Sequence, residues 1–326
     1  MPVVLRPFTD ADLPGLVALQ NAVLPDYPRT IEEIRHSIDA WDHTRFFLRR
    51  FVAEDETGQI VGRGRVAHLP DQFHPDRYEM DLTVHPDHRR RGVGSALYDR
   101  LLAEMRERGA IALRGEVREE MPEAVAFVRH RDFIEIERAW ESRLDVPSFD
   151  PVPFAGADER LTAAGVRITT LEAERDRAPH ALRHVYDLQV ACDRDVPSVH
   201  PITAVPFEQF IAHEVEGPTA LPDGYFLAVT GEGDETRYVG MSSLFASAGT
   251  PEVLNQGLTG VLPPYRGRGV AMALKLQTVC YAQDQGKREI RTWNDTTNQP
   301  MLRINEAMGF ARQPVWIGVE KTLDHP

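Results

Sequence analysis

The chain has 326 residues, which is too long for one ordinary hydrophobic core and about right for two. Hydrophobic residues make up 42% of it and charged residues 27%, the balance of a folded globular protein rather than a disordered one. The formal net charge of −13 argues against a nucleic-acid partner, because such a protein needs a basic face. We also expect no membrane span, no metal site and a cytoplasmic location, since no long apolar run, cysteine cluster or secretory signal is present.

The first part of the chain predicts a mixed alternation of strands and helices. A strand over 3–8 is followed by a helix that begins at Thr9 or Asp10. A second helix over 30–41 opens with Thr30 and has Glu33 three residues later, the spacing of a capping box. Three strands, a helix, a strand, a shorter helix and a closing strand follow, with the expected strands at 46–54, 59–69, 77–84 and 111–117.

The remainder of the chain predicts the same order of elements. Strands are expected at 166–171, 225–231, 237–246, 255–261 and 288–294, and helices at 180–192 and 206–216. We therefore predict an α/β fold of two tandem domains, 1–148 and 149–326, each a mixed, mostly antiparallel sheet flanked by helices.

The connection between the two parts is rich in proline. Three prolines in seven residues, Pro147, Pro151 and Pro153, predict a stiff, extended link over 146–158. A short helix over 159–165 is expected to lead into the second part and to end at Gly165.

Two stretches of the chain, 80–102 and 257–279, repeat one order of features without a gap. A shift of 177 positions places Gly92 on Gly269, and the register holds for some forty residues further. This period is too long for a solenoid unit, so it indicates two copies of one domain.

The most informative repeated segment is a strand, then Arg-x-x-Gly-x-Gly/Ala, then a helix, at 89–94 and 266–271. The N-terminus of a helix presents unpaired backbone N–H groups and the positive end of its dipole, which suit a pyrophosphate. Glycine permits the close approach and the backbone angles that such a turn needs. The alternative is an ordinary strand-to-helix turn without a ligand.

This arrangement resembles the acetyl-CoA site of the GCN5-related N-acetyltransferase (GNAT) family. The second copy has the fuller version of the pattern, because a strand, an asparagine and a helix ending in Gly-Phe follow over 291–310. The resemblance implies acetyl-CoA as cofactor and direct transfer of an acetyl group to the amine of a small molecule. Two alternatives stay open: a non-catalytic regulator that binds acyl-CoA, and a protein N-acetyltransferase. We expect a monomer or a homodimer.

The family's cofactor contacts map onto the strand end, the turn and the motif asparagine. In the second copy they are Leu258, Thr259, Gly260, Val261, Arg266, Gly267, Arg268, Gly269, Val270, Ala271 and Asn298. In the first copy they are Leu82, Thr83, Val84, Arg89, Arg90, Arg91, Gly92, Val93 and Gly94.

The first copy departs further from the family pattern. Met121 stands where Asn298 stands, and Asp132 replaces the glycine of Gly-Phe. We therefore expect turnover chiefly in the second copy. The tyrosine that many family members use as general acid is absent from both copies, since its position holds Asn305 in the second and Val128 in the first.

A general base is also not fixed by the pattern. In the first copy Glu79 and Asp81 share one strand face, where the family often has a carboxylate. The second copy has Gln256 and Leu258 at those positions. Its candidates are Asp193, Asp195, His200, Asp295 and Glu320, each of which has an ordinary surface or capping role as the alternative.

Three further residues of the second copy have two interpretations each. Asn294 ends the predicted strand and either lines the cofactor cleft or caps the next helix. Tyr265 lies either near the adenosine end of the cofactor or on an exposed turn. Trp293 forms either a wall of the acceptor cleft or part of the strand core. Our catalytic candidates are thus Asn294, Asp193, Asp195, His200 and Glu79.

Overall fold

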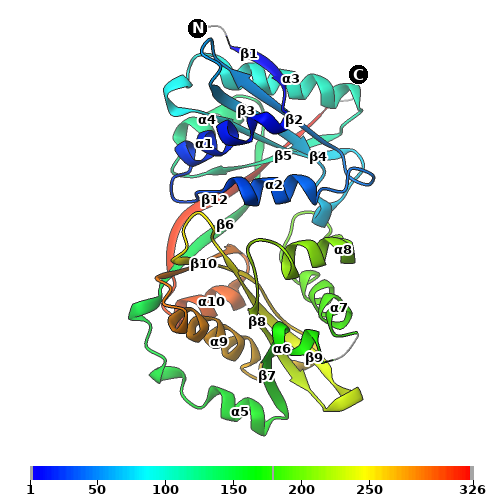
Figure 1. Ribbon diagram of the computed structural model, residues 1–326, viewed down its shortest axis with the longest axis vertical. Helices are drawn as coiled ribbons and strands as arrows, with labels where there is room; N and C mark the ends of the chain where they lie inside the picture. The colour runs from blue at the N-terminus through cyan, green and yellow to red at the C-terminus, as the bar shows by residue number, and fades with distance from the viewer. Residues whose placement is uncertain (1–2, 178–179, 324–326) are drawn as a thin grey trace.

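The computed structural model describes residues 3–177 and 180–323 of the chain. The two repeats form two halves stacked along the long axis of the molecule (Figure 1). The last strand leaves the second half and ends beside the first (Figure 1).

The first half contains four helices and six strands in the repeat's order. They are β1 (Val4–Pro7), α1 (Leu13–Val23), α2 (Ile31–Asp39), β2 (Leu48–Glu54), β3 (Ile60–Ala67), β4 (Arg77–Val84), α3 (Val93–Glu107), β5 (Ala112–Arg118), α4 (Pro122–Arg129) and β6 (Ile134–Asp145).

The second half repeats this order with additional short helices. Its elements are α5 (Ala157–Ala163), β7 (Val166–Thr170), α6 (Leu171–Arg175), α7 (Ala181–Asp193), α8 (Phe207–Phe210), a π-turn (Ile211–Val215), β8 (Ala220–Thr230), β9 (Arg237–Ala246), β10 (Val253–Val261), α9 (Val270–Asp284), β11 (Glu289–Asp295), α10 (Gln299–Ala307) and β12 (Ala311–Thr322).

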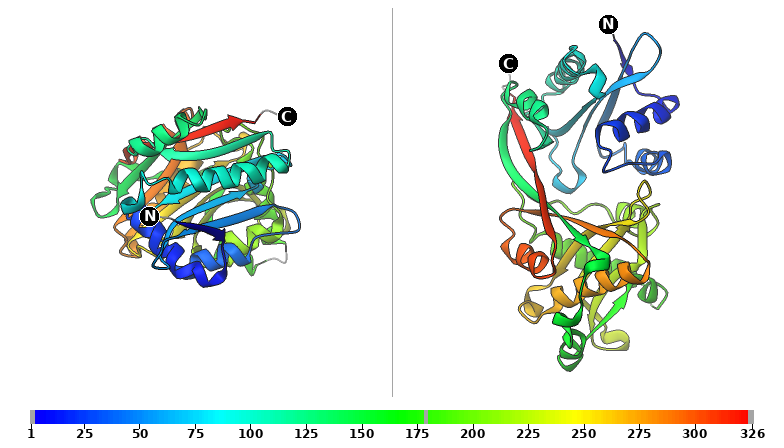
Figure 2. Two further views of the ribbon diagram at one scale, coloured as in Figure 1. Left: turned by 90° about the horizontal axis from the view of Figure 1, so that it is seen from above. Right: turned by 90° about the vertical axis from the view of Figure 1, so that its left-hand side faces the viewer.

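The predicted fold class is confirmed, but the strands form one sheet rather than two. The strand order is β1-β2-β3-β4-β5-β12-β6-β11-β10-β9-β8-β7. Neighbouring strands are antiparallel except for β4–β5 and β10–β11, which are parallel. The closing strands are exchanged: β12 pairs with β5 of the first half, and β6 pairs with β11 of the second. Figure 2 shows these two long strands joining the halves.

The exchange also extends to the two hydrophobic cores. Val315, Ile317 and Val319 of β12 are buried in the core of the first half, where α3 packs on the sheet. Leu144 of β6 is buried in the core of the second half. Burying a side chain of this size contributes roughly 1.5–3 kcal/mol, so each half is stabilised by a strand from the other part of the sequence.

The predicted capping box at the start of α2 is confirmed. The backbone N–H of Glu33 donates to Oγ1 of Thr30 at 3.2 Å, and the backbone N–H of Thr30 donates to Oε2 of Glu33 at 2.7 Å. Two of the free donors at the helix start are thereby satisfied.

The link between the halves differs from the extended segment that we predicted. It contains two short 3₁₀ turns, Val146–Ser148 and Val152–Phe154. The reason is packing: the rings of Phe149 and Phe154 stack with centroids 5.7 Å apart and contribute to the second core. The short helix before β7 is confirmed as α5, and Gly165 after it has φ +73°. A domain boundary near residue 148 stays our proposal.

The helices cover both faces of the sheet. Along β2, Phe51 and Ala53 pack in the core that contains α3, whereas Val52 packs against Leu19 of α1. Helices α1 and α3 therefore lie on opposite faces. In the part of the chain that the structure describes, no helix is both long and apolar enough to cross a membrane.

Candidate active site

The two Arg-x-x-Gly turns have the same backbone conformation. Gly92 (φ +84°) precedes α3 and Gly269 (φ +83°) precedes α9, both in the left-handed region that favours glycine. Two residues earlier, Arg90 (φ +59°) and Gly267 (φ +72°) are also left-handed. A Cβ placed on Gly92, Gly267 or Gly269 would have no heavy atom within 4 Å, so space remains open in front of both turns.

Both turns have the features that a pyrophosphate needs. A glycine cap has no side chain to occupy the first N–H groups of the helix, which therefore remain open to an anion. Val93 and Val270 are buried and hold the helix start against the core. Arg91 and Arg268 flank the turns on the exposed side, and the Arg268 guanidinium lies 5.5 Å from the centre of the Tyr265 ring. The residues present thus fit acetyl-CoA.

The first arginine of each motif braces the turn. Nε of Arg266 donates to the backbone oxygen of Val261 at 2.8 Å, and Nε of Arg89 donates to that of Val84 at 3.3 Å. These bonds hold the strand end to the turn. Arg91 and Arg268, by contrast, are exposed beside the turns.

In each half the two parallel strands separate like a fork. Strand β10 pairs with β11 only from Val253 to Asn255, and β4 pairs with β5 only from Arg77 to Glu79. Residues 256–261 and 80–84 consequently have no ladder partner on the parallel strand. Their backbone groups are free to bind an extended ligand, as the pantetheine arm requires.

Only the second fork contains a β-bulge. Gln256 lies opposite Leu244 and Thr259 opposite Ser242, so β10 has one extra residue there. The pairing of β3 with β4 is regular throughout. A bulge re-aims backbone and side chains beside a site.

The asparagines of the second copy have structural partners. Asn298 caps α10, since its side chain accepts from the backbone N–H of Met301 at 3.4 Å. Asn294 does not cap this helix. Its Oδ1 accepts from Nδ2 of Asn305 at 2.7 Å, and Asn305 is buried at the position of the missing tyrosine. Asn294 is half-buried and remains our candidate for the cleft.

Two residues that we predicted for the second half's site lie beside the first half instead. His200 lies between Nη1 of Arg77, 2.6 Å from its Nδ1, and Oε2 of Glu320, 2.6 Å from its Nε2. Strand β12 places Glu320 beside Arg114 of β5, in the first half. Both residues were candidates for the second copy, but they contact strands of the first half. Strand exchange brings Glu320 there, and the loop between α7 and α8 brings His200 to Arg77.

The other predicted loop residues differ in environment. Asp195 forms an ion pair with Arg266 on the surface. Asp193 is half-buried at the end of α7, and burial together with the nearby Asp71 raises its pKa to about 6. Asp295 accepts from the backbone N–H of Thr297 at 2.7 Å and thus belongs to a local turn.

The carboxylates on β4 are held by arginines. Glu79 pairs with Arg65 at 2.5 Å, and Asp81 pairs with Arg63 at 2.6 Å. On the neighbouring β5, desolvation and then the charges of Glu79 and Glu137 raise the pKa of Glu116 to about 7. We did not predict Glu116, although it lies on β5 just beyond the point where β4 and β5 separate.

A cavity of about 520 Å³ lies where β10 and β11 separate. Asn255, Arg291 and Trp293 line it from the strands, and His213 and Glu214 line it from the π-turn. Burial and the charge of Asp193 raise the pKa of Glu214 to about 7. The structure thus gives Trp293 the role of a cleft wall.

Glu214 was missed because the shift of 177 places a serine, Ser37, opposite it. One signal was available. Glu214 follows the buried Phe210 by four residues, so a helix would place a carboxylate on its apolar face.

Residues of the first half also line this cavity. Tyr27, in the loop between α1 and α2, lines it and donates a hydrogen bond to the buried Glu141 of β6. The guanidinium groups of Arg118 and Arg291 each lie 5.1 Å from the centre of the Tyr27 ring. In the opposite direction, the loop of His200 reaches the first half, where His200 contacts Arg77.

A duplicated fork with a glycine-capped turn defines the GNAT fold class. The model of the acetyltransferase (GNAT) family matches residues 16–133. Mycothiol acetyltransferase of Nocardiopsis dassonvillei is 26% identical over 299 residues, which cover 89% of this chain and 86% of that protein. The mycothiol acetyltransferase of Thermomonospora curvata is 27% identical over 270 residues, 83% of this chain and 82% of that one.

Two solved structures share the fold. A tandem GNAT protein from the clavulanic acid biosynthesis pathway is 20% identical with a TM-score of 0.70, covering 98% of both chains. A GCN5-related N-acetyltransferase from Sphaerobacter thermophilus is 19% identical with a TM-score of 0.69, covering 98% of this chain and 95% of that one. Over residues 16–133 the chain matches the GNAT family. It is an N-acetyltransferase that is similar over most of its length to the mycothiol acetyltransferases and shares the fold of tandem GNAT proteins.

Proposed function

We propose that the second half transfers an acetyl group from acetyl-CoA to the amine of a small molecule. The observation that carries this proposal is the cavity of about 520 Å³ at the fork of β10 and β11, with Glu214 in its wall. The turn at Gly269 and the bulged strand β10 lead to the same fork.

When bound, acetyl-CoA supplies an activated acetyl thioester. The first-turn N–H groups of α9 and the side chain of Arg268 would hold its diphosphate. The free backbone groups of 256–261 would fix the extended arm. A Cβ built on Gly267 or Gly269 would have no heavy atom within 4 Å, which supports an approach of the diphosphate to this turn.

Glu214 is the base that we assign to the acceptor amine. An ordinary primary amine has a pKa of about 10 and must lose a proton to become a nucleophile. A base works best when its own pKa lies near the working pH, and the pKa of Glu214 is raised to about 7. Asp193 supports this role, because its charge raises the pKa of Glu214.

The missing general acid is not replaced by Tyr27. Its hydroxyl donates to Glu141, and burial followed by that carboxylate raises its pKa to about 12. We assign Tyr27 to closing the cavity. The departing thiolate then takes its proton from water.

A matched pair of variants tests which turn supports catalysis. Arg268→Glu places a negative charge beside the second turn, and Arg91→Glu does the same at the equivalent exposed position of the first. We expect Arg268→Glu to weaken acetyl-CoA binding and to lower kcat/KM at least tenfold, whereas Arg91→Glu leaves turnover unchanged. Thiol release is measured over a panel of amines, with acetyl-CoA affinity measured separately.

The first half is the second candidate for turnover. The GNAT family model matches this half, and Glu116 in its fork has a raised pKa. Loss of activity in Arg91→Glu alone would move catalysis there. Acetyl-CoA binding without thiol release on any amine would instead favour a regulator that binds acyl-CoA.

A further inference from the structure

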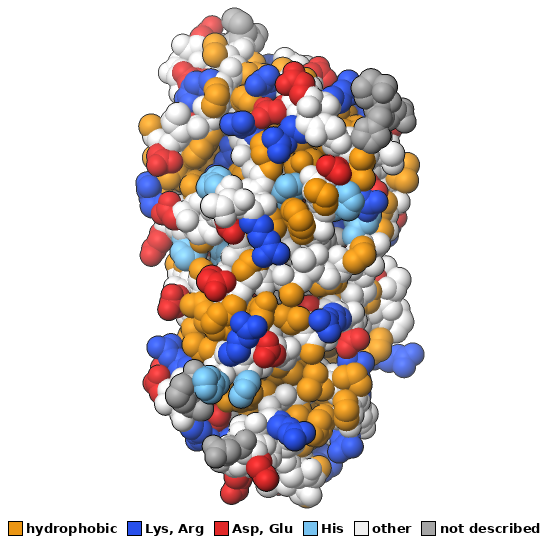
Figure 3. All heavy atoms as spheres, turned by 90° about the vertical axis from the view of Figure 1, so that its right-hand side faces the viewer, with side chains coloured by type: hydrophobic (Ala, Val, Ile, Leu, Met, Phe, Trp, Pro, Cys, Tyr) orange, Lys and Arg blue, Asp and Glu red, His pale blue; other side chains and the backbone are white. Residues whose placement is uncertain are grey.

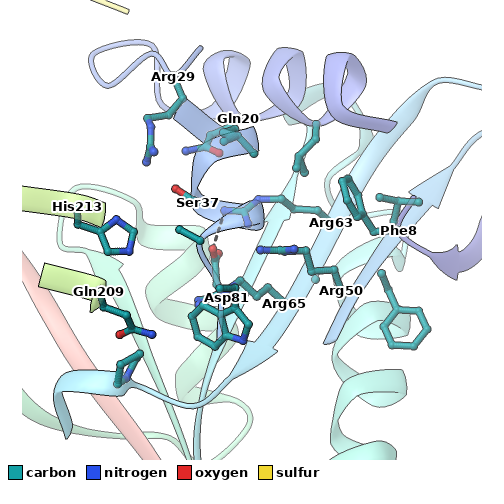
Figure 4. A pocket seen from close by; sticks show the side chains of 18 residues that line it. Phe8, Gln20, Arg29, Ser37, Arg50, Arg63, Arg65, Asp81, Gln209 and His213 are labelled. Atoms are coloured by element: carbon teal, nitrogen blue, oxygen red, sulfur yellow. Dashed lines mark hydrogen bonds and ion pairs between the residues drawn. The ribbon is translucent and has the colours of Figure 1, made fainter. Parts of the chain in front are cut away.

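A second cavity, of about 380 Å³, lies on the face of the first half's sheet that α1 and α2 cover (Figure 4). Strands β2, β3 and β4 form its floor, and Gln209 and His213 of the second half line one side. Phe8, Leu16 and Trp41 give it an apolar part. The cofactor turn at Gly92 starts α3, which packs on the opposite face.

Arginines dominate the polar lining of this cavity. Arg29, Arg50, Arg63 and Arg65 all line it, with Asp81 as the single acidic lining residue. Figure 4 shows Arg50 and Arg63 extending side by side from the strands and Arg29 reaching in from the other side. Figure 3 shows the two signs of charge interspersed on one face of the molecule, so the concentration of positive charge in this cavity contrasts with that surface.

The arrangement of these arginines is unfavourable without a ligand. Arg50 of β2 is the direct cross-strand partner of Arg65 of β3. Like charges directly opposite each other destabilise a sheet. Glu79 pairs with Arg65, and Asp81 pairs with Arg63. Arg50 has weaker partners, namely the Phe8 ring 5.8 Å from its guanidinium and the charge of Asp10. Among the side chains that the structure describes, no carboxylate forms an ion pair with Arg50.

Two further observations indicate that these arginines lack a partner that a bound anion would supply. Nε of Arg63 is buried and has no hydrogen-bond partner among the described residues. Burial, followed by the charges of Arg65 and Arg63, lowers the pKa of Arg50 to about 10. An anion in the cavity would satisfy the free donor and offset the repulsion.

We propose that this cavity binds a small molecule that carries an oxyanion, a carboxylate or a phosphate. Arg50 and Arg63 hold the oxyanion, and the apolar part of the molecule packs on Phe8 and Trp41. This site goes beyond the acetyl transfer proposed for the second half and does not depend on it.

The test is a titration of the full chain with inorganic phosphate and with succinate at constant ionic strength, followed by calorimetry and by the thermal midpoint. We expect saturable binding of at least one of them and a raised Tm. Arg50→Gln and Arg63→Gln should each raise Kd at least tenfold. The control Arg49→Gln, next in sequence but exposed and paired with Glu104, should bind like the wild type.

Two measures keep the result decisive. The Tm of each unliganded variant shows that it is folded, and Arg50→Gln should not lower Tm because it removes a repulsion. The double variant Arg91→Glu/Arg268→Glu, in which phosphate binding at the helix turns is weakened, should still bind. The proposal is overturned if neither anion binds saturably, or if Arg50→Gln and Arg49→Gln have equal affinities.

Discussion

The two halves share a fold and a turn but differ in their clefts. The caps Gly92 and Gly269 have nearly the same φ, and both forks open after three paired residues. The first cleft contains ion-paired carboxylates and a cavity lined by arginines. The second has a bulge, and Glu214 lies among the residues of mixed character that line its cavity.

This difference separates the features that both copies of the domain keep from those in which they differ. The glycine-capped turn and the fork of the parallel strands are present in both halves. The two cavities differ in most of the side chains that line them, although Arg29, Ser37 and His213 line both. The geometry of the turn is thus shared by the two halves, whereas most of the cavity lining is not.

The largest expected effect concerns the proposed base. Glu214→Gln should lower kcat about 100-fold, because an amide cannot take the amine proton. In the wild type kcat should rise with pH through about 7, since the carboxylate is the active form and its pKa is raised to that value. A pH–rate profile of the wild type and the variant measures both.

Two controls sharpen this prediction. Glu216→Gln, an exposed change just after the π-turn, should leave kcat unchanged. Glu116→Gln in the first half should do so as well. If Glu116→Gln abolishes turnover and Glu214→Gln does not, the assignment of the halves is reversed.

The next effect concerns stability. Lys275 of α9 is buried, its pKa is lowered to about 7 by burial, and its ammonium lies 4.7 Å from the centre of the Phe310 ring. Lys275→Met should raise the free energy of unfolding by about 3 kcal/mol below pH 7, where the charged form must be buried. The gain should shrink from pH 7 to about 10.5, since the folded state then holds a neutral amine.

Urea unfolding at several pH values measures this effect. The equivalent position in the first half is Tyr98, whose hydroxyl is buried without a partner among the described residues. Tyr98→Phe should change stability by less than about 1 kcal/mol at every pH. A pH-independent gain in Lys275→Met would contradict the argument.

A smaller effect is expected where α7 crosses β10. A Cβ on Gly260 would lie 2.5 Å from Cβ of Cys192 and 2.7 Å from its Sγ. Gly260→Ala should therefore cost about 2 kcal/mol, because overpacking forces the helix away. Thr83→Ala, the matched change in β4, should cost less than about 1 kcal/mol. Equal losses in thermal unfolding would refute the close contact.

The smallest effect is expected at Asp195. Its ion pair with Arg266 is exposed, and such pairs contribute about 0.5 kcal/mol or less. Asp195→Asn should leave both Tm and kcat close to the wild-type values. A large loss of kcat with an unchanged Tm would return this residue to the list of catalytic candidates.

Sequence patterns were sufficient to predict the features that depend on residues close together in the chain. The turns at Gly92 and Gly269, the capping box of α2 and the strand order within each copy follow from short spacings. Strand exchange, the bulge of β10 and the position of His200 depend on contacts between distant segments, which no spacing reveals. Glu214 depends on both local and distant contacts. Its carboxylate faces a cavity only because the π-turn and residues of the first half enclose that cavity.

The reciprocal placement of β6 and β12 has a consequence for dissecting the molecule. A fragment of residues 1–148 would leave the edge of β5 bare and extend β6 as an unpaired arm. Two such fragments have the means to complete each other, since the β6 arm of each matches the vacancy in its twin. We therefore expect the isolated repeat to form a symmetric dimer or to aggregate, and mixing it with 149–326 to restore the parent assembly.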